Sequence, residues 1–75
     1  VEIQYESREI VNLMNQFLYG LEEQARNLFI LRYWNSDSIE SLSSRFNISS
    51  SKVKSILFRT RKKLRVHLER AGVSL

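Results

Sequence analysis

A run of cations, serines and one phenylalanine near the C-terminus has the side chains needed to bind nucleic acid. No proline interrupts the chain from Ser49 to Gly72, which predicts one long helix, capped by Ser49 and ended by Gly72 in a left-handed turn. On a helix that advances about 100° per residue, the polar side and its edges carry Ser51, Lys52, Lys54, Ser55, Phe58, Arg59, Lys62 and Arg65. This basic face, with a single outward aromatic ring, suits the major groove of DNA.

The opposite side of the same segment predicts the face that packs on the rest of the chain. Its residues lie within about 60° of Val53 on the helix wheel: Ile56, Leu57, Thr60, Leu64, Leu68 and Ala71. His67 falls near this apolar stripe, so we interpret it as a half-buried structural residue. The chain has no other histidine and no cysteine, and therefore no metal site is expected.

Composition indicates one small helical domain over residues 1–75. Two glycines and no proline leave few breaks in 75 residues, and the missing cysteines exclude disulfides and thiolate chemistry. The serines between Ser41 and Ser51 have no neighbouring base, so no catalytic residue and no cofactor are expected. No run is apolar enough for a membrane span or signal peptide, which fits a cytoplasmic protein. Because no methionine begins the chain, we expect it to be a fragment of a longer protein.

Charge divides the chain into two unlike halves. Residues 1–44 hold three basic and seven acidic residues, a net charge of −4, whereas residues 45–75 hold nine basic residues and one acidic residue, a net charge of +8. The sum is the overall +4. This asymmetry favours a polyanionic partner for the C-terminal half, although a solvated helix face would give the same pattern.

Three shorter helices are predicted before the basic one, after a short extended or frayed start over residues 1–5. The first opens with Ser7 as its cap and stops at Gly20, the second covers residues 22–34, and the third covers residues 39–46, capped by either Asp37 or Ser38. Their spacing turns these apolar residues toward the core: Ile10, Leu13, Met14, Phe17, Leu21, Ala25, Leu28, Phe29, Leu31, Trp34, Ile39, Leu42 and Phe46.

The junction between the last two helices has the spacing of a helix-turn-helix. Ser43 is small enough for close helix approach, Asn47 tolerates a left-handed conformation, and Ile48 can turn back to the core. These features predict an all-α, four-helix domain with a helix-turn-helix and a long basic C-terminal recognition helix.

With these residues in view, the chain resembles the C-terminal promoter-recognition domain, region four, of bacterial sigma factors, notably small ones of the extracytoplasmic-function type. Three blocks carry the resemblance: LEEQARNLFILRYW (21–34), SIESLSSRFNIS (38–49) and SKVKSILFRTRKKL (51–64). The chain departs from the family pattern at Asp37, where an apolar or small residue is usual, and at Ser41 and Asn47.

The resemblance implies that the last helix enters the major groove of the promoter −35 element. It places Lys54, Ser55, Phe58 and Arg59 at base- and backbone-contacting positions, and Arg32 at a backbone clamp. It further implies binding to the β-subunit flap of RNA polymerase, and often to an anti-sigma protein. No membrane partner is expected. We expect a monomer when the domain is isolated.

Several assignments stay open at the level of sequence. Lys54 and Arg59 fit either base readers or phosphate anchors, and Ser50, Ser51 and Lys52 fit either phosphate contacts or ordinary capping. Lys62 fits either sequence-independent attraction to DNA or a solvated surface position. Two other functions remain: the four-helix DNA-binding domain of a response-regulator-type transcription factor, and a basic protein-interaction module.

Overall fold

The computed structural model describes residues 7–73, which form four helices. They are α1 (Ser7–Tyr19), α2 (Glu23–Tyr33), α3 (Ile39–Phe46) and α4 (Ser50–Arg70), and no strand occurs within residues 7–73. The predicted all-α class is therefore confirmed. Ser7, predicted to be the cap of the first helix, is the first helical residue of α1. The extended or frayed start predicted for residues 1–5 lies outside the described residues.

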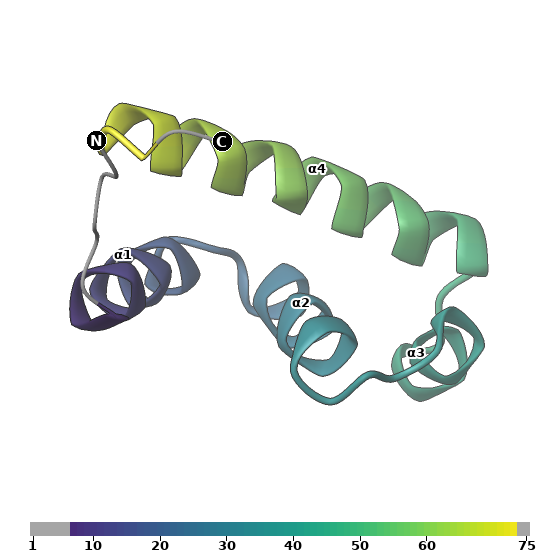
Figure 1. Ribbon diagram of the computed structural model, residues 1–75. Helices are drawn as coiled ribbons and strands as arrows, with labels where there is room; N and C mark the ends of the chain where they lie inside the picture. Colours follow the sequence, from purple (N-terminus) through teal and green to yellow (C-terminus); the bar gives the residue numbers. More distant parts are fainter. Residues whose placement is uncertain (1–6, 74–75) are drawn as a thin grey trace.

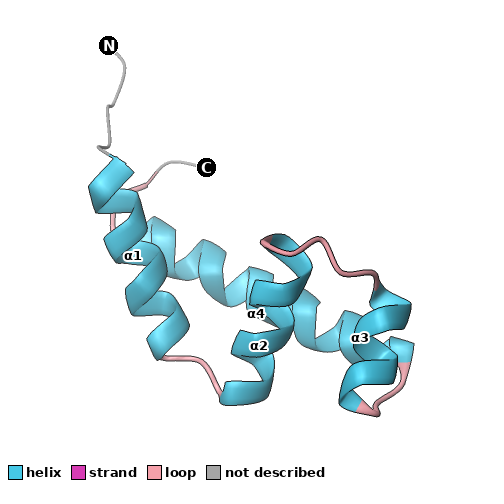
Figure 2. Ribbon diagram, turned by 90° about the horizontal axis from the view of Figure 1, so that it is seen from below, coloured by secondary structure: helices cyan, strands magenta, loops and turns pink. Residues whose placement is uncertain are grey.

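The long helix α4 organises the fold by crossing the other three helices. Figure 1 shows α1, α2 and α3 side by side along one side of α4, and Figure 2 shows the same arrangement from below. α2 packs against both α3 and α4, whereas α1 is held mainly by the C-terminal half of α4. One face of α4 is thus covered along much of its length, and the other is left to solvent.

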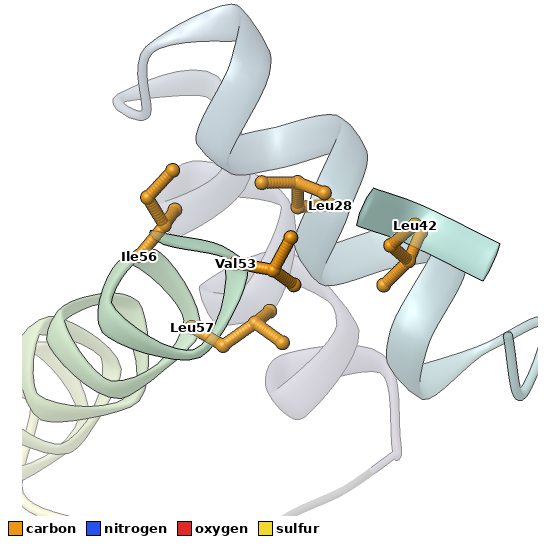
Figure 3. Packing of buried hydrophobic residues seen from close by; sticks show 5 residues of the cluster. All are labelled: Leu28, Leu42, Val53, Ile56 and Leu57. Carbon is orange, nitrogen blue, oxygen red and sulfur yellow. The ribbon is translucent and has the colours of Figure 1, made fainter. Parts of the chain in front are cut away.

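The core lies where α2, α3 and α4 meet. Figure 3 shows its five buried side chains, which are Leu28, Leu42, Val53, Ile56 and Leu57. Leu28, Leu42 and Val53 are 0 % exposed. Burial of an aliphatic side chain of this size stabilises the folded state by about 1.5–3 kcal/mol. The predicted stripe on α4 is therefore confirmed over its N-terminal half.

Serine side chains cap the N-termini of α3 and α4, the two helices of the helix-turn-helix. The Ser38 hydroxyl accepts from the Ser41 N–H at 3.0 Å, and the Ser49 hydroxyl accepts from the Lys52 N–H at 3.1 Å. Each cap satisfies a backbone donor that would otherwise lack a partner in the first helical turn. Ser38, rather than Asp37, is therefore the cap of α3, and Ser49 is confirmed as the cap of α4.

A left-handed residue makes the turn between α3 and α4. Asn47 has φ 55°, as predicted, and the Ile48 N–H reaches back to the Ser43 carbonyl at 3.2 Å. The Ser43 hydroxyl in turn donates to the Ile48 carbonyl. These bonds satisfy carbonyls at the end of α3 and bring Ile48 against the core. Gly72, at φ 88°, ends α4 with the same backbone pattern.

α1 is joined to α2 by an aromatic contact of Phe17, and to α4 by a hydrogen bond and a ring contact of His67. Phe17 is buried and meets the edge of the Phe29 ring, with 6.1 Å between centroids. The His67 Nε2 donates to the Leu13 carbonyl oxygen at 2.9 Å, and the imidazole also lies against Phe17. The half-buried structural position predicted for His67 is confirmed.

Two residues predicted to face the core are exposed. Trp34 is 62 % exposed, because α2 ends at Tyr33 and the indole lies at the surface beside Phe29. Ala71 is exposed because α4 ends at Arg70, just before it. In α1, only Phe17 is fully buried, while Ile10, Leu13 and Met14 are half-buried.

We predict that Asn47→Ala destabilises the domain, because a left-handed conformation costs an ordinary L-residue about 1–2 kcal/mol. Asn47→Gly should preserve the free energy of unfolding within about 0.5 kcal/mol, since glycine adopts positive φ without this penalty. Urea unfolding of both variants measures the difference. Equal stability of the alanine and glycine variants would contradict a conformational role for this position.

Candidate nucleic-acid interface

The face of α4 opposite the core is the candidate interface. Burial of Val53, Ile56, Leu57 and Thr60 fixes the rotation of the helix about its axis. The predicted site residues on the other side are accordingly exposed, namely Ser51, Lys52, Lys54, Ser55, Phe58, Arg59 and Lys62. Ser50, at the first helical position, is half-buried. The predicted orientation of the basic face is therefore confirmed.

Thr60 shows how a polar residue is accommodated on the buried side of α4. It is 2 % exposed, and its hydroxyl donates to the Ile56 carbonyl oxygen at 2.7 Å. Because this bond satisfies the hydroxyl within the helix, Thr60 needs no partner from another element. Its presence does not disturb the division of α4 into a buried and a solvent-facing side.

The N-terminus of α4 adds fixed backbone dipoles to the interface. The Lys52 N–H is used by the Ser49 cap, and the Val53 N–H by the Ser49 carbonyl. The N–H groups of Ser50 and Ser51 have no acceptor within the helix and lie at the positive end of its dipole. Together with the exposed Lys52 ammonium, they form a suitable place for a phosphate.

Phe58 is a large apolar side chain on this face, and it is 54 % exposed. The Lys62 Nζ lies 5.4 Å from the centre of its ring, a cation–π distance. An exposed ring beside a cation can contact an apolar base substituent while the ammonium meets a phosphate. Phe58 and Lys62 thus place an apolar ring and a positive charge next to each other on the exposed side of α4.

Arg32 approaches from the last turn of α2 and is already partly engaged. It is half-buried, and its Nη1 donates to the Asp37 carbonyl oxygen at 2.8 Å. A guanidinium has five N–H donors, so others remain for a phosphate oxygen. The bond makes Arg32 a constrained cation, unlike the exposed lysines of α4.

Two surface features were not predicted from the sequence. One is a contact between Asp37 and Arg45, at 3.5 Å. The other is an apolar groove of about 450 Å³ between α1 and α2, whose lining includes Val11, Ile30 and Trp34. Val11 and Trp34 are both more than half exposed. Adjacent apolar residues at Ile10 and Val11 could have indicated that α1 has more apolar surface than one face can bury.

Within residues 7–73, no cluster of three or more His, Cys, Asp or Glu side chains could hold a metal ion. None of the helices described for this part of the chain is long and apolar enough to cross a membrane.

A helix-turn-helix whose second helix presents an exposed basic face defines the class of DNA-binding domains. A family model described as sigma-70, region 4 matches residues 8–64, more than half of the chain. The chain belongs to this family, and the extracytoplasmic-function type is consistent with it. It is therefore a DNA-binding, promoter-recognition domain of a sigma factor and belongs to a non-catalytic family. No curated protein matches the chain.

We predict that Phe58→Ala weakens binding to a promoter duplex without changing stability by more than about 0.5 kcal/mol, because the ring is mostly exposed. If the ring contacts a thymine methyl group, the loss should disappear when deoxyuridine, which lacks that methyl, replaces thymidine. Fluorescence anisotropy with both duplexes measures this. An equal loss on the two duplexes would exclude the methyl contact.

Proposed function

We propose that this chain binds the −35 element of promoters as region four of an extracytoplasmic-function-type sigma factor, and so directs RNA polymerase to its start sites. The observation that carries the proposal is the rotation of α4. Its core residues hold Lys54, Ser55, Phe58 and Arg59 together on the exposed side, within two helical turns. This spacing matches the few base edges that a helix can reach in the major groove.

The proposed contacts divide into base recognition and backbone binding. Lys54 and Arg59 would reach base edges, where an arginine can bind guanine with two hydrogen bonds. Ser50, Ser51 and Lys52 would hold a phosphate at the N-terminus of α4, and Arg32 a second phosphate from the end of α2. Lys62 would add attraction that does not depend on sequence.

RNA polymerase is the second proposed partner, through the flap of its β subunit. The apolar groove between α1 and α2 supports this assignment, because it lies on different helices from the basic face. A protein segment could occupy the groove while α4 contacts DNA. Trp34, an aromatic residue that is 62 % exposed at the edge of this groove, is the expected anchor.

This function places the protein in the cytoplasm, with the chromosome and the polymerase. An anti-sigma protein that covered either surface would inhibit it. A monomeric domain is favoured over a dimer formed through α4, because the exposed side of that helix carries many like charges that would repel a second copy. This argument also disfavours the response-regulator alternative.

We predict that the chain binds a duplex with a family-typical −35 sequence more tightly than a scrambled duplex of equal length. Arg59→Ala should reduce that preference by about 1–3 kcal/mol, because it removes a base contact. Lys63→Ala, the matched control, should weaken binding to both duplexes alike. Anisotropy titrations at two salt concentrations measure these effects. Equal affinity of the unaltered chain for both duplexes would refute promoter recognition.

We predict that Trp34→Ala weakens binding to an isolated β-flap fragment by about tenfold or more, as expected for a central aromatic anchor. Promoter binding should be unchanged. Val66→Ala is the matched control, because Val66 is also apolar and exposed but lies on α4, outside the groove. Isothermal titration calorimetry measures both affinities. Unaltered flap binding by the Trp34 variant would remove the groove as the docking site.

A further inference from the structure

Asp37 is the most densely connected residue of the loop between α2 and α3. Its side chain is 12 % exposed, with Oδ2 3.5 Å from the Arg45 guanidinium. Its Oδ1 accepts from the Asn35 amide at 3.0 Å, and its own N–H donates to the Leu31 carbonyl at 3.1 Å. These contacts tie the loop to both helices that it connects.

The same loop fixes Arg32. The Asp37 carbonyl oxygen accepts from Arg32 Nη1 at 2.8 Å, so the guanidinium takes its direction from the backbone at this position. That backbone follows Ser36, which has φ 58°, a left-handed conformation that is unfavourable for a serine. The Asp37 side-chain contacts therefore help to hold a loop that local preference alone would not favour.

A carboxylate in this place is electrostatically unfavourable for DNA binding. It belongs to the residue whose carbonyl oxygen binds Arg32, one of the cations proposed to meet the phosphate backbone, and a negative charge repels phosphates. In addition, its buried Oδ2 has no hydrogen-bond partner among the described residues, and the Arg45 ion pair at 3.5 Å is long. Charge alone therefore predicts that removal of the carboxylate strengthens DNA binding.

We propose that Asp37 has the opposite effect, as a positioning residue for DNA binding. Its carboxylate binds Asn35 within the loop and Arg45 on α3, and this places its carbonyl oxygen to hold Arg32 toward a backbone phosphate. This inference rests on the phosphate contact of the proposed function, but not on promoter specificity, because a phosphate contact is independent of base sequence. It can therefore be measured on promoter and scrambled duplexes alike.

The test compares two removals of one negative charge. Asp37→Ala should weaken binding to a duplex about tenfold, as Arg32→Ala does, because a charge-assisted hydrogen bond to phosphate is lost. Glu40→Gln, the matched control, removes an exposed carboxylate three residues away and should leave binding unchanged or slightly tighter. Asp37→Asn keeps the acceptor for Asn35, and should restore part of the affinity. The double variant Asp37→Ala/Arg32→Ala should bind no more weakly than Arg32→Ala.

A second readout separates positioning from stability. Each phosphate of the duplex is replaced in turn by a neutral methylphosphonate. The phosphate that Arg32 contacts is the one whose replacement weakens binding of the unaltered chain but not of Arg32→Ala. Asp37→Ala should also lose sensitivity at that position. Thermal unfolding identifies a temperature at which every variant is folded, and all titrations are made there.

Three results would overturn the inference. The first is that Asp37→Ala binds the duplex more tightly, as the loss of one negative charge alone would predict for it and for Glu40→Gln. The second is that the losses of affinity from Asp37→Ala and Arg32→Ala add up in the double variant. The third is that methylphosphonate at the Arg32 position still weakens binding of Asp37→Ala. If the promoter and scrambled duplexes bind equally but the two losses are not additive, promoter recognition fails and the positioning role stands. If no duplex binds, both fail.

Discussion

The packing of α4 against Leu28 and Leu42 is the contact on which the rest of the structure depends. Val53 and Leu57 are buried in that contact, and a regular helix then places Ser51, Ser55 and Phe58 on the other side. Each buried aliphatic side chain contributes about 1.5–3 kcal/mol, against a typical domain stability of about 5–15 kcal/mol. The face of α4 that we propose to bind DNA is therefore oriented by the same contacts that keep the domain folded.

The sequence was most informative where structure is decided locally. Ser49, Asn47 and Gly72 act through hydrogen bonds or backbone conformations within a few residues, and all three predictions were confirmed. The apolar stripe of α4 was also clear, because a long helix repeats its pattern several times. From these features the fold class and the exposed side of α4 followed without the structure.

The errors lie at helix ends and between helices. Trp34 follows the last residue of α2, where the helical period no longer decides the direction of a side chain, and it is exposed. Neither the groove beside it nor the Asp37–Arg45 contact could be predicted, because both depend on how separate elements meet. The choice between Asp37 and Ser38 as cap was open for a related reason, since both side chains could cap α3 and only the loop geometry decides.

Three arginines in the basic half of the chain contact other residues of the protein. Arg45 is paired with Asp37 and Arg65 with Glu69, while Arg61 donates to the Tyr33 hydroxyl at 2.6 Å. Arg61 is thereby directed toward α2, away from the exposed face. The charge proposed to meet DNA is consequently smaller than the net +8 of residues 45–75, and the proposal places it mainly on Lys52, Lys54, Arg59 and Lys62. Each phosphate contact contributes about −0.9 to the slope of log affinity against log salt concentration. Because few cations are proposed to make such contacts, the part of the affinity that does not depend on sequence is small, and base contacts can determine which DNA sequence is bound.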